Sequence, residues 1–184
     1  MVVASVMASC SNGSNDMVKE LDPANKPSAS QSSSSSSSNV VNTTFDGNIY
    51  FFAAPSQFNY VNTEYTVQVG SQTMTVDVAT LPTTTNYPLV VELDLKQSKS
   101  TFGEGYVTPN VYVFKVPTNL KGDIQITSNF SLKEGANLPK DFFFCYGAES
   151  SDSKGSGIHA NQVITSNFDK FNSKTRTVYS SVLK

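Results

Sequence analysis

The side chains that could carry out acid–base or nucleophilic chemistry are few in this sequence. His159 is the only histidine, which excludes most metal sites and most nucleophile–base pairs. Glu92 and Asp94 lie two residues apart, as cation-binding or proton-transferring carboxylates can, but they alternate with apolar residues and are expected on the solvent face of a strand. No zinc-protease, nucleophile-elbow, phosphate-loop or dinucleotide motif occurs. We therefore predict a non-enzymatic protein with no catalytic residue, no cofactor and no metal.

A second group of polar residues lies in the segment 147–174, which is longer than a simple connection requires. Its "SDSKGSG" places Ser beside Lys, as Ser–Lys hydrolases do, but the composition is typical of an exposed loop. Ile164, Phe168 and Phe171 have helical spacing and predict a short helix, while Val163 among polar residues fits a strand equally well. We predict a binding loop here, whose candidate contact residues are Ser153, Lys154, His159, Asn161 and Asp169.

The two cysteines have different surroundings. Cys145 lies in "KDFFFCYGAE", a run that reads as a buried strand, and free cysteine commonly packs as a small hydrophobe. No base or helix N-terminus that would activate its thiol is evident nearby. Cys10 instead follows the short apolar run 2–7 and precedes a serine-rich stretch. A disulfide between the two cysteines is the alternative, and it would join a polar tail to a strand.

Met7-Ala8-Ser9-Cys10 resembles the lipobox of bacterial lipoprotein precursors. The resemblance implies that the chain is cut before Cys10, that this cysteine carries the lipid, and that the protein is anchored in the bacterial cell envelope, at the outer membrane or cell surface. The family begins with a positively charged segment, whereas no Lys or Arg precedes Lys19 here. We therefore expect the signal to begin upstream of Met1.

The chain after Cys10 is polar and of low complexity, with seven consecutive serines from Ser32 to Ser38. Such a segment cannot bury enough apolar surface to offset its ordering entropy, so we predict a disordered tether. The predicted organisation is a signal remnant over 1–9, a lipidated cysteine with a Ser-rich linker over 10–44, and one folded domain over 45–184.

Short apolar runs separated by Gly, Pro and Asn predict strands throughout the folded domain. The clearest hairpin is "EYTVQVGSQTMTVDVAT", with a two-residue turn at Gly70-Ser71 or Ser71-Gln72. "PLVVELDLK" is also expected to be a strand, with Leu89 and Leu93 facing inward. The other runs are "GNIYFFAA", "VYVFKV", "GDIQITSNFSL", "DFFFCY" and "TRTVYSSVL". We predict an all-β fold, a single antiparallel β-sandwich of immunoglobulin-like or related type. The expected core includes Tyr65, Val67, Val76, Val91, Leu93, Val113, Ile124, Ile126, Phe143 and Val178.

Charge and composition limit the function classes. The net charge is −2 and the thirteen basic residues are scattered, so we expect no nucleic-acid partner. No apolar run reaches the roughly 20 residues that span a bilayer, so membrane contact is expected through the lipid only. We predict an adhesion, assembly or binding module with an envelope protein or a glycan as partner. The alternative is a carbohydrate-binding module or a carboxylate-based hydrolase of the envelope. "FFAAPSQFNY" and "TFGEGYVTPN" could offer aromatic rings beside hydrogen-bonding groups.

Overall fold

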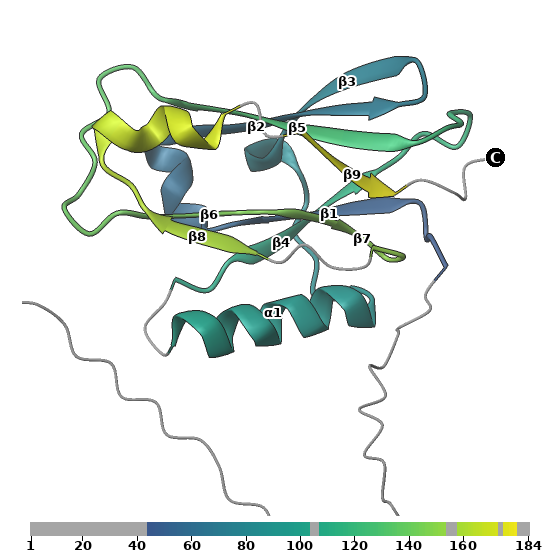
Figure 1. Cartoon of the computed structure of the whole chain (residues 1–184), viewed down its shortest axis with the longest axis horizontal. Coiled ribbons are helices and arrows are strands. Elements are labelled where there is room, and N and C mark those ends of the chain that lie inside the picture. Colours follow the sequence, from purple (N-terminus) through teal and green to yellow (C-terminus); the bar gives the residue numbers. More distant parts are fainter. Residues whose placement is uncertain (1–43, 104–106, 154–157, 173–174, 180–184) are drawn as a thin grey trace, which may run out of the picture. The chain divides into compact units, whose positions relative to one another are not determined.

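A computed structural model describes residues 44–103, 107–153 and 158–172, and the backbone of 175–179 (Figure 1). Cys10, the Ser-rich segment and Lys154 lie outside the described residues. The elements, in chain order, are β1 (Asn48–Ala53), η1 (Pro55–Asn59), β2 (Val61–Val69), β3 (Gln72–Asp77), η2 (Val78–Thr80), α1 (Leu89–Phe102), β4 (Asn110–Lys115), β5 (Ile124–Leu132), β6 (Phe143–Tyr146), β7 (Ala148–Ser150), β8 (His159–Gln162), η3 (Thr165–Phe171) and β9 (Thr175–Tyr179).

The strands form two main sheets and a small one. Sheet A has the order β4-β1-β7, sheet B has the order β3-β2-β5-β9, and β6 pairs with β8. Every strand pair among the described residues is antiparallel. The all-β, antiparallel fold class predicted from the sequence is therefore confirmed.

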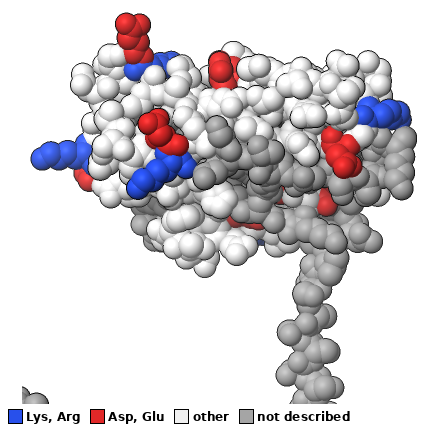
Figure 2. Space-filling view, turned by 45° about the horizontal axis from the view of Figure 1, so that its top comes forward, with Lys and Arg blue, Asp and Glu red and all other residues white. Residues whose placement is uncertain are grey.

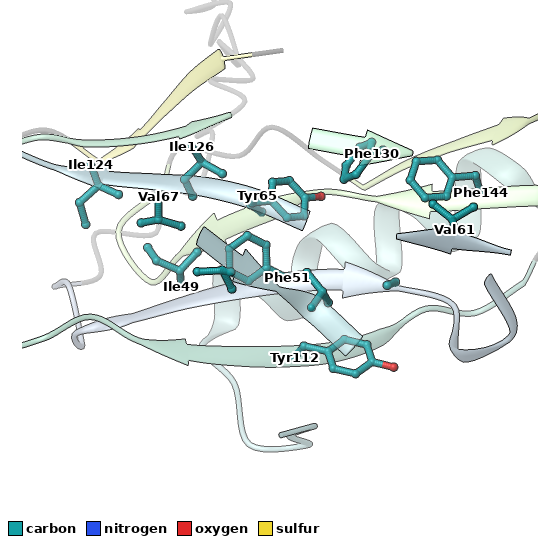
Figure 3. Close-up of a cluster of buried hydrophobic side chains, with 14 of the residues drawn as sticks. Ile49, Phe51, Val61, Tyr65, Val67, Tyr112, Ile124, Ile126, Phe130 and Phe144 are labelled. Carbon is teal, nitrogen blue, oxygen red and sulfur yellow. The ribbon is translucent and has the colours of Figure 1, made fainter. Parts of the chain in front are cut away.

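Sheets A and B face each other across a common apolar core. Figure 3 shows Ile49 and Phe51 of sheet A pointing toward Tyr65 and Val67 of sheet B, and the rings of Phe51 and Tyr65 are 4.7 Å apart. Burial of each such side chain contributes about 1.5–3 kcal/mol relative to exposure. Among the expected core residues, those found buried are Tyr65, Val67, Val76, Val91, Ile124 and Ile126.

The remaining core predictions had other outcomes. Val113 is half-buried, and the side chain of Val178 lies outside the described residues. Phe143 is 41% exposed, so placing it in the core was wrong. It begins β6, and its neighbours Phe144 and Cys145 are the side chains that this strand buries.

The predicted hairpin is confirmed, with Gly70 and Ser71 as its turn. Val69 pairs with Gln72, and Tyr65 pairs with Val76, so the apolar residues of both strands share one face. Gly70 has φ 57°, the left-handed region that glycine adopts without strain.

The segment predicted as a strand from Pro88 is instead the helix α1, and its expected facing is wrong. Val91 and Asp94 are buried, whereas Leu89 is 49% and Leu93 44% exposed. The residues that alternate in the sequence form the first half of a 14-residue helix. The buried residues of this helix have helical spacing and are Val90, Val91, Asp94 and Ser98. The helix begins after Pro88 and ends at Gly103, whose φ of 82° suits a C-terminal glycine.

The helix adds a third layer to the fold. Val90 and Val91 pack with Tyr50 and Phe52, the residues of β1 that point away from sheet B. Figure 1 shows α1 lying along the side of sheet A that sheet B does not cover. Strand β1 is consequently buried on both faces, and α1 runs close to β4. No helix in the part of the chain described here is long and apolar enough to cross a membrane.

The segment 147–174, predicted as a binding loop, contains regular structure. Its described residues hold β7, β8 and η3. The short helix expected at Ile164, Phe168 and Phe171 is present as η3, whereas Val163 follows β8 and is not part of a strand. Strand β8 ends immediately before the buried Val163, and Phe168 of η3 is buried while Ile164 is 55% exposed. The segment is therefore largely an extension of the folded core.

Candidate functional site

A groove of about 870 Å³ lies between α1 and the edge of sheet A. Three segments form it: residues 83–87, one side of α1, and residues 108–111 at the start of β4. Its described lining residues are Thr83, Thr84, Thr85, Tyr87, Glu92, Leu95, Lys96, Ser98, Lys99, Gly103, Thr108, Pro109, Asn110 and Val111. Ligand sites commonly have volumes of about 300–1,000 Å³, so the groove is large enough for a small molecule or part of a polymer.

The threonine-rich wall is held in place by backbone pairing with β4. Strand β4 is at the edge of sheet A, and residues 82–84 cover part of that edge. The Thr84 N–H donates to the Val111 carbonyl at 2.9 Å, and the Val113 N–H donates to the Pro82 carbonyl at 3.0 Å. The Thr84 hydroxyl also accepts from the Asn86 N–H at 3.0 Å and fixes the turn that follows. These hydrogen bonds fix the backbone of this wall against β4.

Apolar side chains also line the groove, and we call them its floor. Pro109 and Val111 are buried, and Leu95 and Tyr87 are half-buried. Tyr87 and Leu95 also pack against the cluster beneath α1 that contains Val90 and Val91. The groove thus has an apolar floor that includes one aromatic ring.

The α1 wall carries the charges of the groove. Glu92, Lys96 and Lys99 project from one side of the helix because residues three and four apart are neighbours on a helix. Lys96 makes an ion pair with Glu92. Lys99, in the last turn, has no ion-pair partner among the described residues, and a cation there complements the helix dipole.

The groove offers little for acid–base catalysis. Glu92 is the only carboxylate among the described lining residues, and it forms an ion pair with Lys96. Tyr112 follows the lining residue Val111, but its own side chain is buried in the core between sheets A and B. Burial raises its pKa, and a hydrogen bond with Asn110 acts in the opposite direction. The groove is therefore suited to binding by hydroxyl and amide groups.

Two buried carboxylates lie elsewhere. Asp94, expected on the solvent side, is only 6% exposed, and Glu149 of β7 is fully buried. Neither lines the groove. Their burial could not be read from the sequence, because Asp94 faces inward only if its segment is helical. No group of three or more His, Cys, Asp or Glu that could hold a metal occurs in the described ranges.

The described residues of the predicted binding loop have different surroundings. His159 and Asn161 of β8 lie around Tyr146: the His159 ring stacks on the tyrosine ring at 5.2 Å, and the Asn161 amide donates to its hydroxyl at 3.4 Å. Burial raises the pKa of Tyr146, and the hydrogen bond from Asn161 lowers it. Ser153 is buried after β7, whereas Asp169 is exposed on η3.

Cys145 occupies the interior that the sequence predicted. Its side chain is fully buried in β6, and its thiol donates to the Val107 carbonyl at 3.6 Å. The backbone N–H of Cys145 donates to the side chain of the buried Gln57. The thiol therefore serves packing in the fold.

Part of the groove comes from a segment noted in the sequence. The sequence predicts aromatic rings beside hydrogen-bonding groups in "TFGEGYVTPN", residues 101–110. Its described part contributes Gly103, Thr108, Pro109 and Asn110 to the groove lining, and none of these is aromatic. The threonines at 83–85 and the side of α1 were missed. Three successive threonines shortly before Tyr87 were a possible sign of a binding surface. The strand predicted over 88–96 gave no reason to expect a groove beside them.

Charged side chains do not gather into a basic patch on the face shown in Figure 2, which turns the upper side of Figure 1 forward. Comparisons of the chain with family models, with curated proteins and with solved structures gave no match. The site is consequently interpreted from its own geometry.

Proposed function

We propose that this protein is a lipid-anchored binding module of the bacterial cell envelope, acting without turnover, and that the groove between α1 and β4 is its ligand site. The observation that carries the proposal is the groove itself: about 870 Å³ with an apolar floor and walls of hydroxyl, amide and charged groups. A large concave site with a few convergent polar groups is the default location for ligand binding.

The anchor is supported by the contrast between the two cysteines. Cys145 is buried and contributes to the core. Cys10 follows Met7-Ala8-Ser9 and precedes the serine-rich segment, as the acylated cysteine of a lipoprotein does. A lipid on Cys10, with the serine-rich segment as a linker, would tether the domain to the membrane surface.

A hydrolase built on carboxylates, the alternative raised by the sequence, receives less support from the groove. Hydrolysis of a glycosidic bond generally uses two carboxylic side chains that flank the bond. The described lining supplies Glu92 alone, in an ion pair with Lys96. Binding is the activity that this set of residues supports better.

A pair of tryptophan variants tests the groove. Thr85 is exposed and lines the groove, whereas Thr75 is exposed on the opposite side of the molecule, on the outer face of sheet B. Thr85→Trp should fill the groove, and Thr75→Trp is the matched control. We expect the purified chain to bind an envelope fraction of the source bacterium. Thr85→Trp should weaken that binding roughly tenfold or more, and Thr75→Trp should leave it unchanged.

The folded state of both variants is checked by circular dichroism and thermal melting. Full binding by a folded Thr85→Trp variant would remove the groove as the ligand site.

A further inference from the structure

We infer that the ligand of the groove is an oligosaccharide; this rests on the proposed function of the groove as a ligand site. Sugar rings are amphipathic, with C–H groups on their faces and hydroxyl groups around their edges. A site that fits them needs an apolar or aromatic floor with hydrogen-bonding groups on both sides. The lining of the groove between α1 and β4 combines both kinds of group.

The floor supplies the contact for a ring face. The Tyr87 ring lines the groove while it also packs against the cluster beneath α1, so its position is fixed before binding. A tyrosine provides a large rigid contact surface with a polar end. The half-buried Leu95 and the buried Pro109 and Val111 extend the apolar surface beside it.

The walls supply hydrogen-bonding groups at the edges. Thr83, Thr85 and Thr108 line the groove and are exposed, so their hydroxyl groups are available to a ligand. The exposed Asn110 also lines the groove, and its amide makes a hydrogen bond with Tyr112. Threonine hydroxyls can both donate and accept, and an asparagine amide offers both functions in one side chain. Their short side chains lose little entropy on binding, and residues 83 and 84 are already fixed by their pairing with β4.

The charge of the walls argues against polyanions as ligands. Binding to nucleic acid rests on many phosphate contacts from Lys and Arg. The described lining contains two lysines, and one of them, Lys96, is paired with Glu92. Hydroxyl and amide groups outnumber the charged groups, which favours a ligand recognised mainly through neutral hydroxyls.

The test uses defined probes and NMR. The ¹⁵N-labelled full chain is titrated with neutral tetrasaccharides of glucose (α- and β-linked), mannose and N-acetylglucosamine. Tetra-aspartate peptide and a DNA tetranucleotide are the probes of other classes. We expect at least one oligosaccharide to bind with Kd of about 1 mM or tighter. The amide shifts should map to residues 83–87, 95–99 and 108–111.

Paired substitutions test the contacts themselves. Thr83→Val/Thr108→Val removes two hydroxyls with little change of shape and should weaken oligosaccharide binding roughly tenfold. Thr73→Val/Thr75→Val makes the same change on the exposed outer face of sheet B and should have no effect. Tyr87→Phe should retain binding because it keeps the ring, whereas Tyr87→Leu should lose it. Because Tyr87 also packs in the fold, thermal melting accompanies this pair, and the threonine variants give an independent answer.

The outcomes separate the two proposals. If Thr85→Trp abolishes binding to the envelope fraction but no oligosaccharide binds, the groove remains the ligand site and the oligosaccharide inference is overturned. If oligosaccharides bind with shifts outside the groove, and Thr85→Trp has no effect, both proposals are overturned. Preferential binding of the peptide or the tetranucleotide in the groove would likewise overturn the oligosaccharide inference alone.

Discussion

The phenol of Tyr50 donates a hydrogen bond to Asp46 Oδ2 at 2.6 Å and so connects strand β1 to the residues that lead into it. Burial, this hydrogen bond and the charge of Asp46 raise the pKa of Tyr50 to about 12. The Asn48 amide donates to the same phenol oxygen at 3.4 Å and acts in the opposite direction. The folded state thus favours the neutral phenol.

Stability should therefore fall at high pH in a way that depends on Tyr50. An unfolded tyrosine ionises near pH 10. Because the folded pKa is higher, the stabilisation is fully present below about pH 10 and is lost as the pH rises through about 12. Urea unfolding at about pH 9 and pH 11.5 should show a larger loss for the natural protein than for Tyr50→Phe. At neutral pH the variant should lose about 1 kcal/mol with the hydrogen bond. Equal losses in the two proteins at high pH would contradict this assignment.

Val91 and Leu93 distinguish a helix from a strand at this segment. In a strand both side chains would share the buried face, but in α1 Val91 is fully buried and Leu93 is 44% exposed. We expect Val91→Ala to lower the free energy of unfolding by about 2 kcal/mol, because it leaves a cavity. Leu93→Ala should change it by less than about 0.5 kcal/mol. The comparison is made by urea denaturation, and similar large costs at both positions would argue for the strand.

Gly70 and Gly122 pack closely where the β2–β3 turn meets the chain before β5. A Cβ on Gly70 would lie 2.3 Å from the Lys121 carbonyl oxygen, whereas a Cβ on Gly47 would meet nothing within 4 Å. Gly70 and Gly47 both have a positive φ, 57° and 86° respectively. Gly47→Ala should therefore show the backbone strain alone, about 1 kcal/mol, and Gly70→Ala should cost about 2 kcal/mol more through the clash. Equal melting temperatures for the two variants would show that the contact is absent.

Membrane attachment should depend on Cys10. The gene is expressed with its natural upstream sequence in a bacterium, and detergent phase partitioning compares the natural protein with Cys10→Ala. We expect the natural protein in the detergent phase and the variant in the aqueous phase, since an acylated cysteine would be the anchor. Cys145→Ala serves as the control, because its buried side chain should have no role in anchoring. Detergent partitioning of Cys10→Ala equal to that of the natural protein would exclude this cysteine as the anchor.

The strands and the β2–β3 hairpin could be predicted from the sequence. Seven of the eight predicted strand segments contain a strand, because alternation of apolar and polar residues reflects a local geometry in which successive side chains point to opposite faces. The facing of the hairpin followed from the matching apolar sets on either side of the turn. The choice of Gly70-Ser71 over Ser71-Gln72 as the turn came from the structure, in which Val69 pairs with Gln72.

Whether residues 88–102 form a helix or a strand depends on the packing around them. "PLVVELDLK" alternates over a few residues, and the same letters begin a helical stripe, so local periodicity fits both. Tyr50 and Phe52 resolve the ambiguity, because the outer face of sheet A needs a cover and α1 buries Val90 and Val91 there. The groove follows from that packing. The groove is lined by residues 83–87, α1 and the start of β4. No local sequence pattern predicts that these three segments lie together, because their proximity depends on the helix packing beside the edge of the sheet.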